Sequence, residues 1–407
     1  MAPTESVLRR SIRHDPRQEQ DDTLPNTLLF HALLRFANRS PQRIAIRDVN
    51  LGIERTYAQL LPDVLSLRRQ IRSQLSAATL EKLREEQEIY IANLAPGGYE
   101  YTVAFLAILA LGAAAVPLST QVPVDEAAYL LRKSKSIAIV TASTCKTLGA
   151  SIETYLRANG SPDFQSISIL PSLGISLVLA QDILISPTPA LDENNAGVII
   201  FTSGTTGPPK GVVMRRSFVY SYALSVADHY QLTETDTILH ILPVHHATGV
   251  GINFFPFLVS GACVEFRNGS FDASWLWERW QAGGLTFFSG VPTIYIRMMR
   301  FYQQKLAILP DPERYQYVRA VRNLRGLLCG SSALPGPIQK FWTDISAGKG
   351  ILTRYGGTEF GAPFKLGPDD QDVPEGSVGQ LEIGLDVKLS GGDEGEILIK
   401  SPHMFGR

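Results

Sequence analysis

The segment 196–211, AGVIIFTSGTTGPPKG, constrains this chain more than any other part of it. It begins with an apolar, β-branched run, Ala196–Thr202, which indicates a buried strand. A loop of glycines, hydroxyl side chains and one cation, Lys210, follows at once. Glycine lets backbone N–H groups approach a phosphate closely, and hydroxyls and a lysine add donors and positive charge. The segment therefore predicts a strand followed by a loop that binds a triphosphate.

This loop differs from the widespread phosphate-binding loop that ends in Gly-Lys-Ser/Thr and opens a helix. Here Lys210 follows two prolines and precedes a glycine. Prolines cannot supply a row of free backbone N–H groups, so we predict a flap that closes over the phosphates. The alternative is a surface turn rich in glycine and threonine. A turn would explain a three-residue match better than it explains the whole run 201–211 after a buried strand.

Strand-like and helix-like segments alternate along most of the chain. Helical periodicity covers residues 28–37, 57–74 and 125–135, and β-rich runs cover 44–46, 89–92, 137–141, 196–202, 237–242, 262–266, 286–288 and 324–329. This alternation predicts an α/β fold with two packed, parallel-type sheets and flanking helices. Residues 376–399 are rich in Gly, Val, Ile and turn residues, and they predict antiparallel hairpins that form part of a β-barrel.

We divide the chain into four predicted parts: a flexible tail at 1–22, a first α/β subdomain at 23–190, a second at 191–375 and a β-hairpin segment at 376–407. The apolar run Tyr101–Ser119 approaches the length of a membrane span. Gly112 and the following alanines instead favour a buried helix that turns into a buried strand. We therefore predict no membrane span.

Charge and cysteine content limit the partners and the compartment. Lys and Arg number 38 against 39 for Asp and Glu, which gives no electrostatic reason to expect nucleic acid as a partner. Three cysteines without metal-binding spacing predict buried thiols in an intracellular, cytoplasmic protein. Acidic residues between the arginines of the first 22 residues make a mitochondrial presequence the weaker interpretation. The last residues show no peroxisomal signal, and nothing in the sequence predicts an oligomeric state.

Several further segments accompany the loop in a fixed order. They are Leu242–Gly249 (LPVHHATG), Gly330–Pro335 (GSSALP) and Tyr355–Glu359 (YGGTE). Together with TSGTTGPPKG, they resemble the motifs of the adenylate-forming superfamily, which contains acyl-CoA synthetases, adenylation domains and luciferases. Residues 376–379 and 395–399 resemble later hairpins of the same fold. The resemblance runs from about residue 25 to the last residue, and this combination of motifs is highly specific.

The resemblance implies a role for each matching residue. Lys210, His246 and Glu359 would be catalytic, with Glu359 holding Mg²⁺ and His246, rather than His245, near the acyl and adenylate groups. The ATP phosphates would contact Thr202, Ser203, Gly204, Thr205, Thr206, Gly207, Lys210 and Thr358. The adenine and acyl pocket would include Gly330, Ser331, Ser332, Tyr355, Gly356 and Gly357, with the Tyr355 ring on adenine.

These roles fit the chemistry of acid activation. A carboxylate is a poor electrophile, and transfer of AMP to it creates a mixed anhydride with a good leaving group. The protein must neutralise the triphosphate, align the acid oxygen with the α-phosphorus and bind Mg²⁺. A lysine and several hydroxyls suit the first task, and a hard carboxylate ligand suits the metal. We therefore predict an enzyme that activates a small carboxylic acid with ATP and transfers it to CoA.

The segment Gly290–Met299, GVPTIYIRMM, looks closest to malonyl-CoA synthetase-like members. A dicarboxylic acid needs a cation for its spare carboxylate, and Arg297 and Lys340 are candidates, although either can equally be an exposed helix residue. Gly357 stands where these relatives carry a larger side chain, often Met. If it lines the pocket, it leaves room for a branched or longer acid than malonate. Polycarboxylic, hydroxylated and medium-chain acids of a specialised pathway stay open.

Relatives continue beyond the segment that matches residues 401–407, with a ribose-binding Thr-Gly-Asp motif and a small domain that carries an adenylation lysine. Neither occurs in this sequence, so we expect weak or no ligase activity from the 407-residue chain alone. Acid-dependent ATP–pyrophosphate exchange tests this, and normal turnover would contradict it. Two alternatives are a truncated, inactive nucleotide- or acyl-binding protein and an adenylation domain that loads a carrier protein. No carrier-like segment is present, which favours free CoA as acceptor.

Overall fold

A six-stranded sheet forms the first layer of the computed structural model, which describes residues 21–176, 178–188, 191–202, 207–370 and 373–407. Its strands lie in the order β10-β9-β5-β4-β6-β7. Their bounds are β4 Tyr90–Leu94, β5 Ala114–Pro117, β6 Ser136–Thr141, β7 Gln165–Ser168, β9 Ala196–Thr202 and β10 Lys210–Arg215. All neighbours are parallel except β10, which pairs antiparallel with β9. Most of the predicted tail lies outside the described residues.

A second, nine-stranded sheet has the order β17-β16-β15-β14-β13-β11-β12-β2-β3. Its strands are β2 Ile44–Asp48, β3 Ile53–Thr56, β11 Thr237–His240, β12 Cys263–Phe266, β13 Phe287–Gly290, β14 Gly326–Cys329, β15 Leu352–Gly357, β16 Gly361–Lys365 and β17 Gln380–Leu381. The strands from β15 to β2 are parallel, and the outer strands are antiparallel. The predicted α/β class with two parallel-type sheets is confirmed.

The two sheets exchange strands between distant parts of the chain. The β2–β3 hairpin, from residues 44–56, joins the second sheet, and β9 and β10, from residues 196–215, join the first. The predicted segments 23–190 and 191–375 therefore each supply strands to both sheets. A β-branched run identifies a strand, but tertiary packing decides which sheet receives it.

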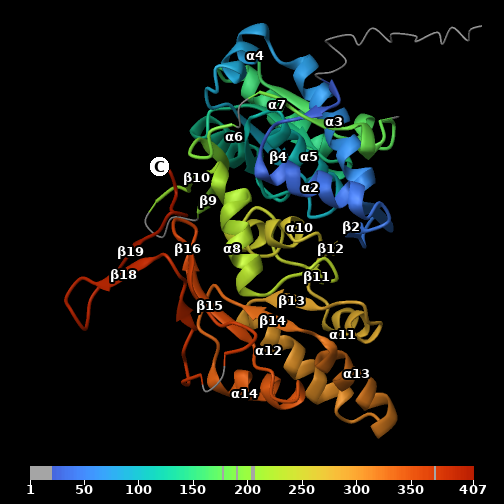
Figure 1. The fold of residues 1–407 in the computed structure, drawn as a ribbon, viewed down its shortest axis with the longest axis vertical. Helices are drawn as coiled ribbons and strands as arrows, with labels where there is room; N and C mark the ends of the chain where they lie inside the picture. The colour runs from blue at the N-terminus through green and yellow to red at the C-terminus, as the bar shows by residue number, and fades with distance from the viewer. Residues whose placement is uncertain (1–20, 177, 189–190, 203–206, 371–372) are drawn as a thin grey trace, which may run out of the picture.

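Helices cover both sheets and lie between them (Figure 1). Near the first sheet lie α2 Leu28–Arg39, α3 Tyr57–Gln74, α4 Ala77–Arg84, α5 Tyr99–Ala110, α6 Val124–Lys133 and α7 Lys146–Ala158. Next come α8 Ser221–His229, α9 Ala247–Gly251 and α10 Phe255–Val259. At the lower end of Figure 1 lie α11 Ala273–Gln281, α12 Pro292–Phe301, α13 Asp311–Asn323 and α14 Gly336–Ile345. Helix α5 contacts β4, β5 and β2, so it separates the two sheets.

The apolar run at 101–119 forms most of α5 and then β5, as predicted. Every residue of α5 is buried, and its 12 residues are too few to cross a bilayer. No helix in the described part of the chain is long and apolar enough to span a membrane.

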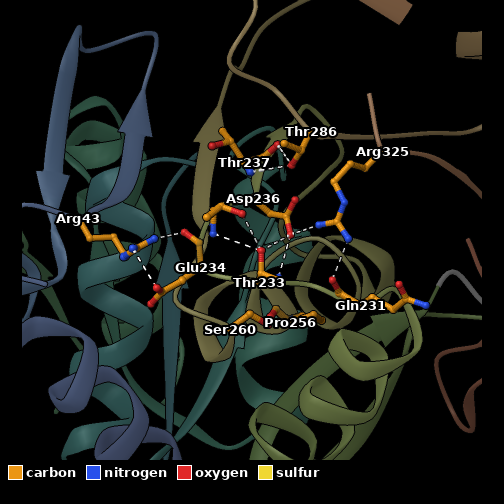
Figure 2. Close-up of polar contacts among 11 residues, drawn as sticks. Arg43, Gln231, Thr233, Glu234, Asp236, Thr237, Pro256, Ser260, Thr286 and Arg325 are labelled. Atoms are coloured by element: carbon orange, nitrogen blue, oxygen red, sulfur yellow. Dashed lines mark hydrogen bonds and ion pairs between the residues drawn. The ribbon is translucent and has the colours of Figure 1, made fainter. Parts of the chain in front are cut away.

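A polar network holds the amino ends of the second sheet together (Figure 2). The Asp236 carboxylate, before β11, accepts hydrogen bonds from the Thr233 N–H at 2.8 Å and from the Arg325 guanidinium, just before β14. Arg325 also donates to the Gln231 carbonyl at 3.0 Å. The network stabilises the end of the sheet where these parallel strands begin. In α/β sheets, ligands bind at the opposite end, beyond the carboxyl ends of the strands.

The carboxy-terminal segment is the predicted hairpin region. Strands β18 Asp386–Leu389 and β19 Ile397–Lys400 pair antiparallel and project from the body of the molecule (Figure 1). Beyond them the chain returns to the edge strand β10. There the Gly406 N–H donates to the Val213 carbonyl at 2.8 Å, and the Val213 N–H donates to the Arg407 carbonyl at 2.9 Å. All three cysteines are free and buried, as the sequence predicts.

Candidate nucleotide and acyl site

A cavity of about 620 Å³ opens at the carboxyl ends of β11, β14 and β15. This volume lies within the range of sites for small molecules. Its walls are mostly apolar or formed by small residues. They comprise Phe218, Tyr222, Ile241, Leu242, Pro243, His246, Ala247, Thr248, Gly249, Ile252, Val291, Ile294, Ser331, Arg354, Gly356, Gly357, Thr358, Gly361 and Ala362. Five residues predicted for the site are among them: His246, Ser331, Gly356, Gly357 and Thr358.

His246 lies on the cavity wall at the start of α9. The Val250 N–H donates to the His246 carbonyl at 3.0 Å, which fixes the backbone there. Burial of the ring lowers the His246 pKa, so the imidazole is neutral at pH 7 and can accept or donate one hydrogen bond. Burial, and then the adjacent His246, lower the His245 pKa to about 4, and His245 is not among the lining residues.

The predicted phosphate loop connects β9 and β10, two antiparallel strands. Thr202 ends β9 and Lys210 begins β10, and the Thr202 hydroxyl donates to the Lys210 carbonyl at 3.4 Å. Gly207 and the Lys210 side chain are exposed, and the Lys210 ammonium forms no ion pair within the described residues. Ser203, Gly204, Thr205 and Thr206 lie outside the described residues. The Lys210 ammonium is thus available to an anionic ligand beside the hairpin.

The turn between β15 and β16 carries Thr358 and Glu359. The Phe405 N–H donates to the Glu359 carbonyl at 3.0 Å, and the next residues pair with β10, so the chain end ties this turn to the phosphate hairpin. Within the described residues no three His, Cys, Asp or Glu side chains are grouped as metal ligands. Mg²⁺ commonly takes only one or two protein carboxylates and completes its shell with phosphates and water. The half-buried Glu359 carboxylate, which has no partner among the described side chains, fits that need.

Of the remaining predicted pocket residues, Ser331 lines the cavity, whereas Gly330, Ser332 and Tyr355 are not among its lining residues. Gly330 directly follows β14, and Ser332 is exposed. The Tyr355 ring is also exposed, and it stacks on Phe360 with the ring centroids 6.2 Å apart. Ser331 adopts a positive φ of 71°, a conformation that costs a non-glycine residue free energy. Such strain often accompanies a residue held for binding, and Ser331 lines the cavity.

Gly357 lines the cavity, but it leaves less room than its lack of a side chain suggests. A Cβ atom at position 357 would lie 2.8 Å from two ring carbons of Phe360. The Phe360 ring therefore occupies the space that a larger residue at 357 would fill. The sequence shows the missing side chain but not the ring that replaces it.

Arg297 and Lys340 lie away from the cavity lining. The Arg297 guanidinium lies 4.1 Å from the centroid of the Phe271 ring, on the exposed side of α12. The Lys340 ammonium pairs with Asp344 at 3.0 Å on the exposed face of α14. Both positions are those of surface residues in this structure.

The sequence did not single out three prominent residues of the cavity. Phe218 and Tyr222 stack with centroids 5.1 Å apart and form one wall. Arg354 immediately precedes the YGGTE segment, lines the cavity and is only 7% exposed. In the sequence, only its position directly before a recognised motif distinguishes Arg354 from other arginines.

Comparison with known proteins identifies the group to which this fold and site belong. The family model for AMP-binding enzymes matches residues 33–407. The chain belongs to the AMP-binding enzyme family. An acyl-CoA ligase of Aspergillus oryzae is 31% identical over 393 residues, which are 94% of this chain and 66% of that protein. A mitochondrial malonate–CoA ligase of Xenopus laevis is 31% identical over 304 residues, 73% of this chain and 50% of that protein.

Solved structures of AMP-binding enzymes share the fold. ATP-bound MatB from Rhodopseudomonas palustris superposes with a TM-score of 0.72 at 22% identity. The superposition covers 92% of this chain and 71% of the MatB chain. O-succinylbenzoate CoA synthetase from Bacillus subtilis, in complex with AMP, gives a TM-score of 0.69 at 22% identity, with 92% of this chain and 88% of that one covered. The chain spans about two thirds of the length of the first curated relative.

Proposed function

We propose that this AMP-binding enzyme activates a small carboxylic acid with ATP as an acyl-adenylate and transfers the acyl group to CoA. The observation that carries the proposal is a largely apolar cavity lined by His246 and by Thr358 of the β15–β16 turn, a turn that the chain end connects to strand β10. A cavity of that kind suits an acyl chain, and the hairpin and turn offer cationic, hydroxyl and carboxylate groups for the nucleotide. The relatives named as acyl-CoA and malonate–CoA ligases support the same chemistry.

Each proposed role follows from a side chain's type and place. Lys210 would offset charge on the phosphates, and the hydroxyl of Thr358, a residue that lines the cavity, would bind the α-phosphate. His246 would orient the acid carboxylate through a hydrogen bond, because it lines the cavity. Its imidazole is neutral, so it would not bind a further anion in place of the acid. Glu359 would hold Mg²⁺, which offsets negative charge as the phosphates separate. CoA as acceptor, and a specialised pathway for the product, are parts of the same proposal.

A stable analogue of the intermediate tests the proposal directly. We expect a 5′-O-(N-acylsulfamoyl)adenosine to bind the purified 407-residue chain at least about 100-fold more tightly than AMP in a calorimetric titration. Such an analogue fills the nucleotide and acyl sites together. Equal affinities for the analogue and for AMP would contradict an acyl pocket beside the nucleotide site.

A second measurement tests the assignment of Lys210. Lys210→Met is expected to weaken ATP binding about tenfold or more, because a charge-assisted contact to the phosphates is lost. Binding of AMP, which carries less charge, should change by less than about threefold. Lys305→Met removes an exposed lysine elsewhere and is the matched control. Equal losses of ATP and AMP affinity would contradict the role given to Lys210.

A further inference from the structure

Arg354 is the one permanently charged side chain among the described residues that line the cavity. It lies on β15, and it is 7% exposed. Both terminal guanidinium nitrogens are shielded from solvent and have no hydrogen-bond partner among the described residues. A buried charge without a partner is costly, so such an arrangement calls for an anion.

Among the described residues, the groups around Arg354 supply no free anion of this kind. Its positive charge influences the pKa of Tyr222, Tyr230, Tyr295, Cys329 and Lys365, of which four are neutral at pH 7 and one is a cation. The Tyr230 hydroxyl lies close to the guanidinium, but the two do not meet the distance and angle limits of a hydrogen bond. A neutral hydroxyl would in any case leave the charge uncompensated.

The Glu382 carboxylate, directly after β17, is already engaged by another cation. Lys365 lies directly opposite Arg354 in the β15–β16 pair and is 1% exposed. Its ammonium pairs with the Glu382 carboxylate and donates to the Ala362 carbonyl at 2.8 Å. Lys365 and Glu382 form a neutral pair, and the charge of Arg354 stays in excess beside the cavity.

We propose that the acid activated at this site carries a second anionic group, best matched by a carboxylate, and that Arg354 binds it. The inference rests on the proposed function. A guanidinium forms two parallel hydrogen bonds with a carboxylate, and it does so most strongly where water is excluded. Arg354 lies on the cavity wall with its terminal nitrogens shielded from solvent, so binding requires the guanidinium to turn toward the cavity.

The position of Arg354 also bears on the length of the acid. Arg354 and Thr358, the proposed phosphate contact, both line the cavity and are four residues apart along β15 and its turn. Since the reacting carboxylate must sit at the phosphate, the distance between the Thr358 hydroxyl and the Arg354 guanidinium sets the length of acid that can contact both.

The missing side chain of Gly330 leaves room for the Arg354 side chain. A Cβ atom at position 330 would lie 3.0 Å from Cγ and Nε of Arg354 and 3.1 Å from Cζ. The absence of a side chain there lets the guanidinium stem pass close to the backbone after β14. Gly330→Ala is therefore expected to displace Arg354 without removing its charge.

Two acyl-adenylate analogues that differ in one group test the proposal. Hexanoyl- and 5-carboxypentanoyl-sulfamoyl adenosine share the nucleotide and the chain length, and only the second ends in a carboxylate. We expect the purified 407-residue chain to bind the carboxylated analogue at least about tenfold more tightly in a calorimetric titration. Arg354→Gln should abolish this preference while changing hexanoyl affinity by less than about threefold. Arg354→Lys should restore part of it, and Gly330→Ala should reduce it.

The outcomes separate the inference from the function on which it rests. Equal binding of both analogues to the unmodified chain, or a preference that survives Arg354→Gln, overturns the role of Arg354 and leaves acid activation in place. If Arg297→Gln loses the preference and Arg354→Gln keeps it, the role proposed for Arg354 is wrong and Arg297 binds the second carboxylate. Arg300→Gln, an exposed residue of the same helix, controls for loss of a charge. If neither analogue exceeds AMP in affinity, the proposed function itself fails.

Discussion

His240 should make the stability of this protein depend on pH. It is the last residue of β11, and it is 1% exposed. Its Nε2 lies 3.1 Å from the Gly249 carbonyl, and Nδ1 has no partner among the described residues. Its ring stacks on Phe266 with centroids 5.0 Å apart. Nothing in these surroundings accommodates a second proton and its charge, and burial lowers the pKa of His240 to about 4 from its ordinary value of 6.5.

The sign of the effect follows from proton linkage. Because the pKa is lower in the folded state, the unfolded chain binds the proton more readily, and acid favours unfolding. The full stability is present above pH 6.5 and is lost as the pH falls toward 4. For one histidine shifted this far, the free energy of unfolding should drop by about 2 kcal/mol between pH 7 and pH 5.

Urea unfolding at both pH values, followed by tryptophan fluorescence, measures this drop. Other histidines with lowered pKa values, such as His246 and His403, add to it in the same direction, so the informative quantity is the difference between variants. His240→Gln should lose about 2 kcal/mol less than the unmodified chain on acidification, and His240→Asn is a second neutral replacement. His31→Gln, at an exposed site, is the control. The reasoning is refuted if His240→Gln and the unmodified chain lose the same stability.

Two further substitutions test buried ion pairs. Lys365→Met should destabilise the chain by about 3 kcal/mol, because it leaves the Glu382 carboxylate, which is 13% exposed, without its counter-charge. An unchanged midpoint of urea unfolding would show that the ion pair does not stabilise the fold. Arg325→Met should cost about 2 kcal/mol, less than a fully buried pair because Arg325 is 39% exposed while the Asp236 side chain is fully buried. The double variant Arg325→Met with Asp236→Leu should recover part of that loss in the same assay, and a loss as large as that of the single variant would contradict the explanation.

Local features predicted much of the fold. Helix α3 begins where a capping box stands, with the Thr56 hydroxyl accepting from the Gln59 N–H at 3.2 Å and the Gln59 side chain accepting from the Thr56 N–H at 2.9 Å. Strand β9 and the buried helix α5 follow from continuous apolar runs. These elements are set by neighbours in sequence, and for that reason a single sequence is enough to find them.

The arrangement of the site depended on contacts that the sequence does not display. The ring of Phe360 fills the space beside Gly357, and only the folded turn brings the two together. Arg354 cannot be identified from the sequence, because an arginine next to a motif has no pattern of its own. Its importance comes from burial and from the lack of a partner, and both are properties of three-dimensional surroundings.

The exchange of strands between the two sheets has a consequence during synthesis. Strand β2 pairs with β12, so that Ile46 lies beside Val264, a residue made more than 200 positions later. At roughly 5–20 residues per second, the ribosome needs about 10–40 s to produce that partner. Throughout this interval the nascent hairpin β2–β3 presents an unpaired edge, which is a template for aggregation. Chaperones that shield emerging chains should therefore matter more for the yield of this protein than for one whose strands pair with their neighbours.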